Sequence, residues 1–303
     1  MPPARNAYTI RQITESSMQN AAPTLPLDLT VTVRRALEED IGSGDLTAAL
    51  IPPAATARAT VLCRQAAVIC GGPWFDEVFQ MLDPALQIIW QVAEGDSVNA
   101  DTVLCTLQGN ARILLTGERT ALNFLQLLSG TATAARRYAE AVRGSGCQVL
   151  DTRKTLPGLR LAQKYATACG GVRNHRVGLF DGILVKENHI MAAGGIDAAV
   201  AAARASAPDL PIEVEVENRD ELRAALGTGA DIVMLDNFDL DELRAAVALN
   251  QELRDPPAML EASGNVDLDR LPAIAATGVD FVSVGAITKH LEAIDLSMRF
   301  YLD

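Results

Sequence analysis

Six short, β-branched segments alternate with helical segments after Ser145, and this alternation restricts the fold more than any other feature of the chain. The predicted strands cover residues 148–152, 182–185, 212–216, 232–235, 258–262 and 281–284. Amphipathic helices are predicted between the later strands, at 219–227, 240–253 and 268–277. Strands that alternate with helices form a parallel sheet, because each connection crosses the sheet through a helix. Six such units favour a β/α barrel, complete or incomplete, over an open doubly wound sheet.

The preceding part of the chain has a different pattern. A helix is predicted at 31–39, a long helix at 113–143, and short strands at 57–63, 67–70, 87–92 and 102–107. Strands clustered with few helices between them indicate an α+β unit with an antiparallel sheet. Within the long helix, Glu118 falls in the apolar stripe and Arg119 at its margin, which is typical of a buried ion pair or an interface.

The charge of the chain is unevenly distributed. The whole sequence carries −12, whereas the segment 151–190 holds seven Lys or Arg against three Asp or Glu, including three of the four lysines. A protein this acidic lacks the broad basic surface that nucleic acids and anionic membranes require, so neither is expected as a partner. Scarce cations gathered in one segment indicate that a small, strongly anionic ligand binds there.

Other features of the sequence bear on the compartment. The chain is 49% apolar, which suits a soluble globular protein, and no run of about eighteen apolar residues predicts a membrane span. Residues 1–25 are predicted to be a flexible leader, since this polar stretch lacks the apolar middle of a signal peptide. The cysteines form no CxxC pair and no metal-like grouping with histidine, so reduced, mostly buried thiols in a cytoplasmic protein are expected. They are Cys63, Cys70, Cys105, Cys147 and Cys169.

Polar residues or glycines occur at the carboxyl end of each predicted strand. In a β/α barrel these ends form one rim, so residues far apart in the sequence meet around one mouth. We therefore predict an active site at this rim. The residues concerned are Arg153 and Lys154 after the first strand, Lys186 and Asn188 after the second, Glu215 and Glu217 at the third, Asp236 and Asn237 after the fourth, Ser263, Gly264 and Asn265 after the fifth, and Gly285 and Ala286 after the sixth.

The cations at the predicted rim indicate the chemistry of the ligand. Arg153, Arg176, Lys154 and Lys186, with His175 beside them, offer hydrogen-bond donors suited to carboxylates and phosphates. Like charges about 4 Å apart repel by roughly 4 kcal/mol in an intermediate dielectric. Such a cluster needs an anionic ligand or nearby acids to offset the repulsion.

Acids and glycines complete the predicted site. Glu215 and Asp236 suit sugar hydroxyls or a Mg²⁺ ion that keeps most of its water. The triplets 263–265 and 284–286 place glycine where backbone N–H groups can approach a phosphate, directly before helices whose amino ends favour anions. Together these residues describe a site for a phosphorylated sugar and a second anion.

These motifs resemble those of the quinolinate phosphoribosyltransferase family, and the resemblance covers nearly everything after the leader. The matching runs are DIGSGDLT (40–47), GERTALNFLQLLSGTAT (117–133), DTRKTLPGLR (151–160), GGVRNHR (170–176), LVKENHI (184–190), EVEVEN (213–218), MLDNF (234–238), EASGN (261–265) and SVGAITKH (283–290). The activity that the resemblance implies is phosphoribosyl transfer from phosphoribosyl pyrophosphate to quinolinate with decarboxylation, a pentosyltransferase reaction of NAD biosynthesis that uses Mg²⁺.

The resemblance also implies a domain organisation. An N-terminal α+β sandwich domain with the connecting helix would cover residues 26–143, and an incomplete α/β barrel would cover 144–290. Residues 291–303 would pack back on the N-terminal domain. The resemblance implies a homodimer in which Arg119 reaches into the active site of the neighbouring subunit. Assembly of dimers into a higher oligomer stays open. Glu118 is still interpreted as part of a buried ion pair or an interface.

Residue roles follow from the same resemblance. The two carboxylates of quinolinate would be held by cations, with Thr152 on the same wall, while Lys154 would lie between substrate and pyrophosphate. Glu215 and Asp236 would face the ribose and Mg²⁺. Lys154, Lys186, Glu215 and Asp236 are the predicted catalytic residues. The quinolinate cations would be Arg153, His175, Arg176, Lys186 and Arg119 of the partner subunit, and the 5′-phosphate would be bound by Ser263, Gly264, Asn265, Val284, Gly285 and Ala286.

Three alternatives stay open. Lys186, late in a barrel strand, could form a Schiff base in an aldolase. A sensor of a phosphorylated metabolite would explain the cations but not the pair Glu215 and Asp236. The chain could also be a related phosphoribosyltransferase that acts on nicotinate or another aromatic base. Comparing turnover of quinolinate with turnover of nicotinate would separate this alternative from the quinolinate enzyme.

Overall fold

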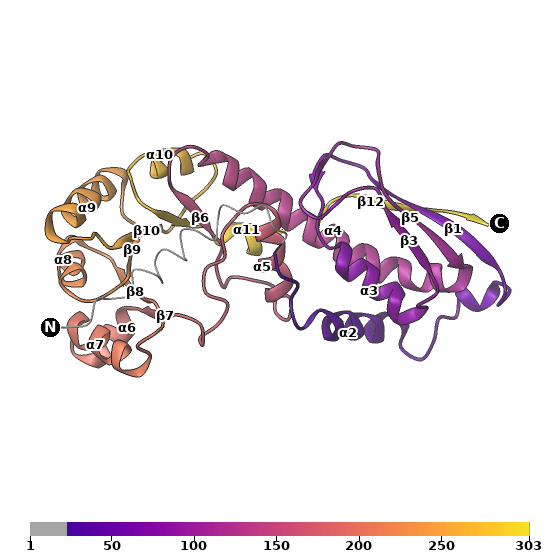
Figure 1. Cartoon of the computed structure of the whole chain (residues 1–303), viewed down its shortest axis with the longest axis horizontal. Coiled ribbons are helices and arrows are strands. Elements are labelled where there is room, and N and C mark those ends of the chain that lie inside the picture. The colour runs from indigo at the N-terminus through magenta and orange to yellow at the C-terminus, as the bar shows by residue number, and fades with distance from the viewer. Residues whose placement is uncertain (1–22, 303) are drawn as a thin grey trace.

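The computed structural model describes residues 23–302, so most of the predicted leader lies outside the described residues. Figure 1 shows an elongated molecule with a sheet at each end and the long helix α4 (Ala111–Ala141) reaching from one part to the other. The parallel sheet and its helices form the left part, and an antiparallel sheet forms the right part. No helix within the described range is long and apolar enough to cross a membrane.

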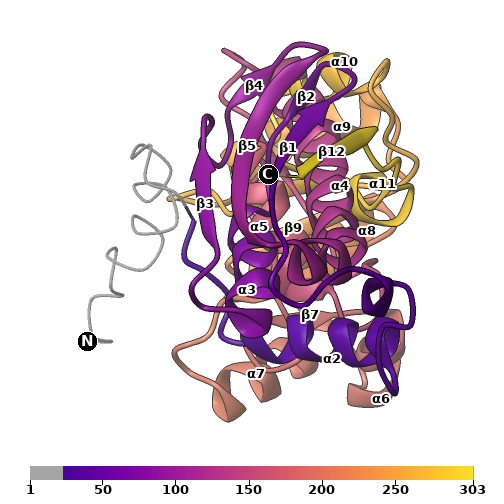
Figure 2. The same ribbon diagram turned by 90° about the vertical axis from the view of Figure 1, so that its right-hand side faces the viewer.

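The antiparallel sheet of the N-terminal domain has the strand order β12-β1-β5-β3. Alternate residues of β1 are buried, from Ala57 to Cys63, as expected for a strand with one face on a core. β12 comes from the other end of the chain and lies beside β1, with Ala57 opposite Leu302 and Cys63 opposite Leu296 (Figures 1 and 2). The strands are β1 (Thr56–Cys63), β3 (Gln87–Trp90), β5 (Thr102–Asn110) and β12 (Leu296–Leu302), and β2 (Ala67–Val68) pairs separately with β4 (Ser97–Val98).

Three helices pack together beside this sheet: α2 (Leu29–Ile41), α3 (Gly72–Leu82) and α4. A short 3₁₀ helix, η2 (Ala48–Leu50), follows α2 in the chain. The sequence pattern did not predict α3, because its aromatic and β-branched residues favour strands. The buried residues Trp74, Phe75, Val78 and Phe79 nevertheless recur at helical spacing, and Pro73 occupies the first turn, where its missing N–H costs nothing.

Helix α4 connects the two parts of the molecule. Its first turn is capped by the Asn110 side chain, which accepts hydrogen bonds from the backbone N–H of Arg112 at 2.9 Å and Ile113 at 3.4 Å. At Gly130 the helix meets the chain leading into β12 so closely that an added Cβ would lie 2.2 Å from the Glu292 carbonyl oxygen. The segment that leads into β12 therefore packs directly against α4.

The second sheet is a six-stranded parallel sheet with the order β6-β11-β10-β9-β8-β7. Its edge strands β6 and β7 do not pair with each other within residues 23–302, so the barrel is open on one side. This confirms the predicted fold, an incomplete β/α barrel with an N-terminal α+β domain. The strands are β6 (Gln148–Leu150), β7 (Ile183–Val185), β8 (Ile212–Val216), β9 (Ile232–Asp236), β10 (Met259–Ser263) and β11 (Phe281–Ser283).

Each barrel strand leads into a helix, and the strands are mostly buried on both faces, as parallel strands covered by helices are. One helix is shorter than predicted: residues 268–277 contain only α10 (Leu271–Ala275). The helices in order are α5 (Arg160–Cys169), α6 (Glu187–Ala193), α7 (Ile196–Ser206), α8 (Arg219–Gly227), α9 (Leu240–Leu253), α10 and α11 (Ala286–Lys289).

Candidate active site

The carboxyl ends of the six parallel strands form one edge of the barrel, which we call the rim. Asp151, at the start of the rim segment after β6, is fully buried and holds this segment in place. Its carboxylate accepts hydrogen bonds from the Lys164 ammonium at 2.5 Å, the Thr167 hydroxyl at 2.8 Å, the Asn174 amide at 2.6 Å and the His175 backbone N–H at 2.9 Å. One carboxylate therefore joins β6, α5 and the loop that carries His175 and Arg176.

Thr152 and Lys154 lie against the turn that follows β11. A Cβ built on Gly285 would be 2.8 Å from Lys154 Cδ and 3.3 Å from Thr152 Oγ1, so glycine is needed for this close approach. The Thr288 hydroxyl donates to the Lys154 carbonyl at 2.8 Å, which ties α11 to the same segment. The predicted residues after the first and sixth strands are thus brought together.

Lys186, Glu215 and Asp236 form a second group at the ends of β7, β8 and β9. Lys186 Nζ forms an ion pair with Glu215 Oε2, and both side chains are partly exposed. Burial raises the pKa of Asp236, and the negative charge of Glu215 raises it further, while Lys186 and Lys154 act in the opposite direction. Two carboxylates and two ammonium groups therefore influence one another across the rim, where the sequence analysis had placed all four residues.

The turn after β10 packs closely against the turn after β9. Gly264 has a φ of +101°, and an added Cβ would lie 2.2 Å from Asn237 Oδ1. Asn237 and Asn265 also have positive φ angles, of 58° and 46°, and the Asn237 N–H donates to the Ser263 carbonyl at 2.8 Å. Backbone in this conformation exposes N–H groups of the kind that cradle anions.

Two arginines lie close enough to repel each other. Burial lowers the pKa of Arg176, and the neighbouring positive charge of Arg153 lowers it further. Arg176 donates one hydrogen bond to the Gly182 carbonyl at 3.2 Å, whereas the buried Nε of Arg153 has no hydrogen-bond partner among the described residues. An arginine left in this state is suited to an anionic ligand.

His175 lies in the barrel interior with two buried glutamates. Its Nδ1 accepts the Arg176 backbone N–H at 2.7 Å, so Nε2 carries the proton and donates to Glu213 at 2.9 Å, with Glu261 3.6 Å away. Burial lowers the pKa of His175, which the sequence analysis grouped with the cations, while the negative charge of Glu261 acts in the opposite direction. Burial also raises the pKa of Glu213 to about 7 and that of Glu261 well above its usual range.

Arg119 is exposed on α4, and no hydrogen bond or ion pair within residues 23–302 joins it to the rim. Glu118 beside it is half buried, and this burial raises its pKa despite the Arg119 charge. Val284 and Ala286 flank Gly285, and the Val284 N–H donates to the Leu150 carbonyl at 2.9 Å. Thus every predicted site residue except Arg119 belongs to the rim or the interior directly behind it.

Several residues that build the site were missed by the sequence reasoning. Asp151, Thr167 and Asn174 form the buried network, and Glu213 and Glu261 hold His175. A signal was present, since Glu213 and Glu261 are acids inside strands that otherwise read as apolar, and buried acids are rare unless they are partnered. Lys164, also buried, donates to Asp151 and to the His175 carbonyl.

The fold and the site together define a β/α-barrel protein with arginines, lysines and acids gathered at one rim. Two family profiles match the chain: "Quinolinate phosphoribosyl transferase, N-terminal domain" over residues 45–129, and "Quinolinate phosphoribosyl transferase, C-terminal domain" over residues 131–299. The chain belongs to the quinolinate phosphoribosyltransferase family, which confirms the resemblance seen in its motifs.

Individual relatives agree with this assignment. A probable nicotinate-nucleotide pyrophosphorylase (carboxylating) of Synechocystis sp. is 44% identical over 264 residues, 87% of this chain and 89% of the relative. The human nicotinate-nucleotide pyrophosphorylase (carboxylating) is 39% identical over 280 residues, 91% and 93% of the two chains. The solved structure of the nicotinate-nucleotide pyrophosphorylase from Francisella tularensis is 46% identical, has a TM-score of 0.88, and is similar over 93% of this chain and 100% of that one.

Proposed function

We propose that this enzyme transfers phosphoribose from phosphoribosyl pyrophosphate to quinolinate and removes one carboxylate, giving nicotinate mononucleotide, CO₂ and pyrophosphate. The observation that supports this most directly is the closeness of Arg153, whose buried Nε has no partner among the described residues, to Arg176. The acids Glu215 and Asp236 lie at the same rim. A dicarboxylate would offset the positive charges of the two arginines. A sugar that becomes cationic during the reaction would be stabilised by the two acids. The relatives at about 40% identity carry the matching name and disfavour nicotinate as the substrate.

Quinolinate would bind where the arginines meet. Arg153 and Arg176 would each pair with a carboxylate, with Lys186 completing the cation set and Thr152 on the same wall. His175 uses both ring nitrogens inside the protein, so its role would be to position Arg176 through the backbone N–H it accepts. Desolvated arginines hold a planar dicarboxylate in one orientation, which turns the ring nitrogen toward the sugar.

Phosphoribosyl pyrophosphate would bind along the rest of the rim. Glu215 and Asp236 would face the ribose hydroxyls, and Lys154 would lie between quinolinate and the pyrophosphate. The 5′-phosphate would be bound by backbone N–H groups of two turns, formed by Ser263, Gly264 and Asn265 and by Val284, Gly285 and Ala286.

The acid pair also fits a magnesium ion. Glu215 and Asp236 supply the hard oxygen donors that Mg²⁺ prefers, and their mutual repulsion is what a divalent cation would relieve. Since Glu215 already pairs with Lys186, the ion would keep water ligands on this side. When bound, Mg²⁺ would neutralise charge on the pyrophosphate of the substrate.

The chain's own residues account for the remaining steps of the mechanism. Lys154 offsets the charge that develops on the departing pyrophosphate, while Glu215 and Asp236 fix the ribose as it becomes oxocarbenium-like. The quinolinate nitrogen then bonds to C1 from the opposite face. The resulting cationic ring accepts the electron pair of the breaking C–C bond, CO₂ departs, and the ring carbon takes up a proton. The protein orients and desolvates, without a covalent nucleophile.

We also propose a cytoplasmic homodimer in which Arg119 of the partner subunit completes the cation set, with no role for nucleic acid or membrane. Five free, buried thiols fit a reducing compartment. The exposed position of Arg119, away from its own rim, is consistent with a role in another subunit. Mixed dimers of Arg119→Ala and Lys186→Ala, each inactive alone, should regain roughly a quarter of the wild-type turnover, because half of the dimers have one intact site. No recovery after verified subunit exchange would contradict the shared site.

The decisive assay measures CO₂ and pyrophosphate released from phosphoribosyl pyrophosphate with quinolinate or nicotinate. We expect stoichiometric release of both products with quinolinate and little pyrophosphate with nicotinate. The Arg176→Ala variant should lose quinolinate affinity and turnover. Unchanged affinity and turnover in this variant would contradict the assignment of the quinolinate site, and pyrophosphate release without CO₂ would contradict the reaction.

A further inference from the structure

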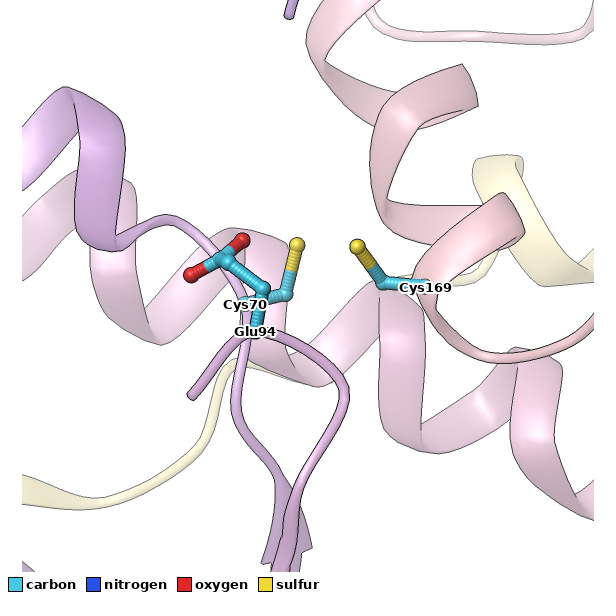
Figure 3. A group of neighbouring side chains, drawn as sticks. All are labelled: Cys70, Glu94 and Cys169. Carbon is cyan, nitrogen blue, oxygen red and sulfur yellow. The ribbon is translucent and has the colours of Figure 1, made fainter. Parts of the chain in front are cut away.

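A cluster of two thiols and a carboxylate lies between the N-terminal domain and the barrel, apart from the rim (Figure 3). Cys70 lies between β2 and α3, Glu94 in the loop between β3 and β4, and Cys169 at the end of α5. Their potential ligand atoms all lie within 4.8 Å of one another, and both cysteines are buried. Figure 3 shows the two sulfur atoms facing each other with the carboxylate beside them.

The backbones of Cys70, of Cys169 and of Gly95, the residue after Glu94, are held to the same helix, α4. The Ser129 hydroxyl accepts the Cys70 N–H at 2.9 Å and donates to the Cys70 carbonyl at 3.0 Å. The Arg136 guanidinium donates to the Cys169 carbonyl at 3.2 Å and to the carbonyl of Gly95, next to Glu94, also at 3.2 Å. The cluster is therefore prearranged by bonds that do not involve the ligand atoms.

The Glu94 carboxylate is oriented as well. It accepts the backbone N–H of Gly71 at 3.0 and 3.1 Å and that of Gly72 at 2.9 Å, at the amino end of α3. These bonds occupy the side of the carboxylate that faces the helix and fix its position beside the two thiols.

We propose that Cys70, Glu94 and Cys169 bind a Zn²⁺ ion that fastens helix α5 of the barrel to the N-terminal domain. Two thiolates and one carboxylate are ligands that Zn²⁺ accepts, whereas Mg²⁺ and Ca²⁺ require oxygen. Sulfur ligands of a tetrahedral Zn²⁺ lie roughly 3.8 Å apart, because each Zn–S bond is about 2.3 Å, so only a small adjustment is needed. Binding releases the two thiol protons to solvent.

The proposed ion would act on the active site at a distance. Helix α5, which ends at Cys169, carries Lys164 and Thr167, and both grip Asp151. Fastening the end of α5 would restrict the motion of this network. The inference does not depend on the proposed reaction, because its test measures metal binding and stability and leaves turnover aside.

The test uses the full chain, stripped of metals with a chelator and kept reduced in excess Mg²⁺, which occupies oxygen-only sites. Titration with Co²⁺ should give one ion per chain with thiolate-to-metal charge-transfer absorption, and Zn²⁺ should displace it and raise the Tm by roughly 5 °C. Cys70→Ser and Cys169→Ser should abolish this absorption. Cys147→Ser, which alters a buried cysteine outside the cluster, should retain it.

Glu94→Gln provides a test that does not require loss of a buried cysteine. Glutamine keeps a carbonyl oxygen that can accept the Gly71 and Gly72 N–H groups, so the helix cap survives while the charged ligand is lost. Its Zn²⁺ affinity should fall at least about tenfold. Any of three results would overturn the proposal: no thiolate absorption in the wild type, equal absorption in Cys70→Ser, or mass spectrometry showing a Cys70–Cys169 disulfide in a chain that binds no Zn²⁺ once reduced.

Discussion

Lys164 and Asp151 form an ion pair sealed inside the protein, with 2.5 Å between the ammonium nitrogen and the nearer carboxylate oxygen and side-chain exposures of 3% and 0%. The pair joins α5 to the end of β6, where the rim begins. Burial lowers the pKa of Lys164, and Asp151 counteracts this shift. A charge pair in this position contributes more to orientation than to net stability, because desolvation of both groups offsets much of their attraction.

Breaking this pair should be costly. Lys164→Met leaves Asp151 buried without its counter-charge, and we expect the free energy of unfolding to fall by roughly 3–5 kcal/mol in urea titrations monitored by circular dichroism. The matched control is Lys289→Met at the exposed end of α11, which should change stability by less than about 0.5 kcal/mol. Equal effects of the two substitutions would show that Asp151 does not depend on Lys164.

Gly285→Ala should displace Lys154 with little effect on folding. The new Cβ would lie 2.8 Å from Lys154 Cδ, so the lysine side chain has to move. Because a shift of about 1 Å in a catalytic group can cost on the order of a hundredfold, steady-state assays should show a large fall in kcat. Gly227→Ala is the control, since an added Cβ there meets nothing within 4 Å. A fully active Gly285→Ala enzyme would remove Lys154 from the catalytic set.

Arg153→Leu should separate stability from activity. The substitution removes a buried, unpartnered Nε and the repulsion with Arg176, so the Tm of the ligand-free protein should rise by roughly 2–4 °C. At the same time kcat/KM for quinolinate should fall by about a hundredfold or more. Arg160→Leu, which loses hydrogen bonds to Thr155 and the Val177 carbonyl, should instead lower the Tm. A lower Tm for Arg153→Leu would contradict the repulsion.

Glu213 should make stability depend on pH. Its pKa is raised from a usual 4.5 to about 7, so between these pH values the folded protein holds a proton that the unfolded chain has lost, and stability falls as pH increases. In Glu213→Gln this contribution disappears. The stability of the variant minus that of the wild type should therefore be larger at pH 7.5 than at pH 5. Urea unfolding midpoints of both proteins at the two pH values measure this difference. A difference that does not vary with pH would place the pKa of Glu213 near its usual value.

The barrel could be read from the sequence because its signals are local. Strand β8 and helices α8 and α9 begin and end where the alternation of β-branched and amphipathic segments predicted them. The predicted barrel also placed Lys186 near Glu215, because neighbouring parallel strands end at the same edge of the sheet, and the two side chains form an ion pair.

The remaining features depend on long-range packing. The lowered pKa of His175 results from burial and from the positive charges of Lys164 and Arg176, and a linear pattern does not record this burial. Cys70 and Cys169 meet beside the Glu94 carboxylate although they lie far apart in the sequence, so no local spacing of cysteines indicated this cluster.

The pairing of β12 with β1 has a consequence for how the protein is made. β1 leaves the ribosome early, but β12, its partner on one side, is synthesised only after the whole barrel. One edge of β1 therefore stays unpaired until translation is nearly finished. An unpaired strand edge of this kind can associate with other chains. A fragment cut after α4 would keep that open edge permanently, so the barrel is in effect an insertion within the sheet that precedes it.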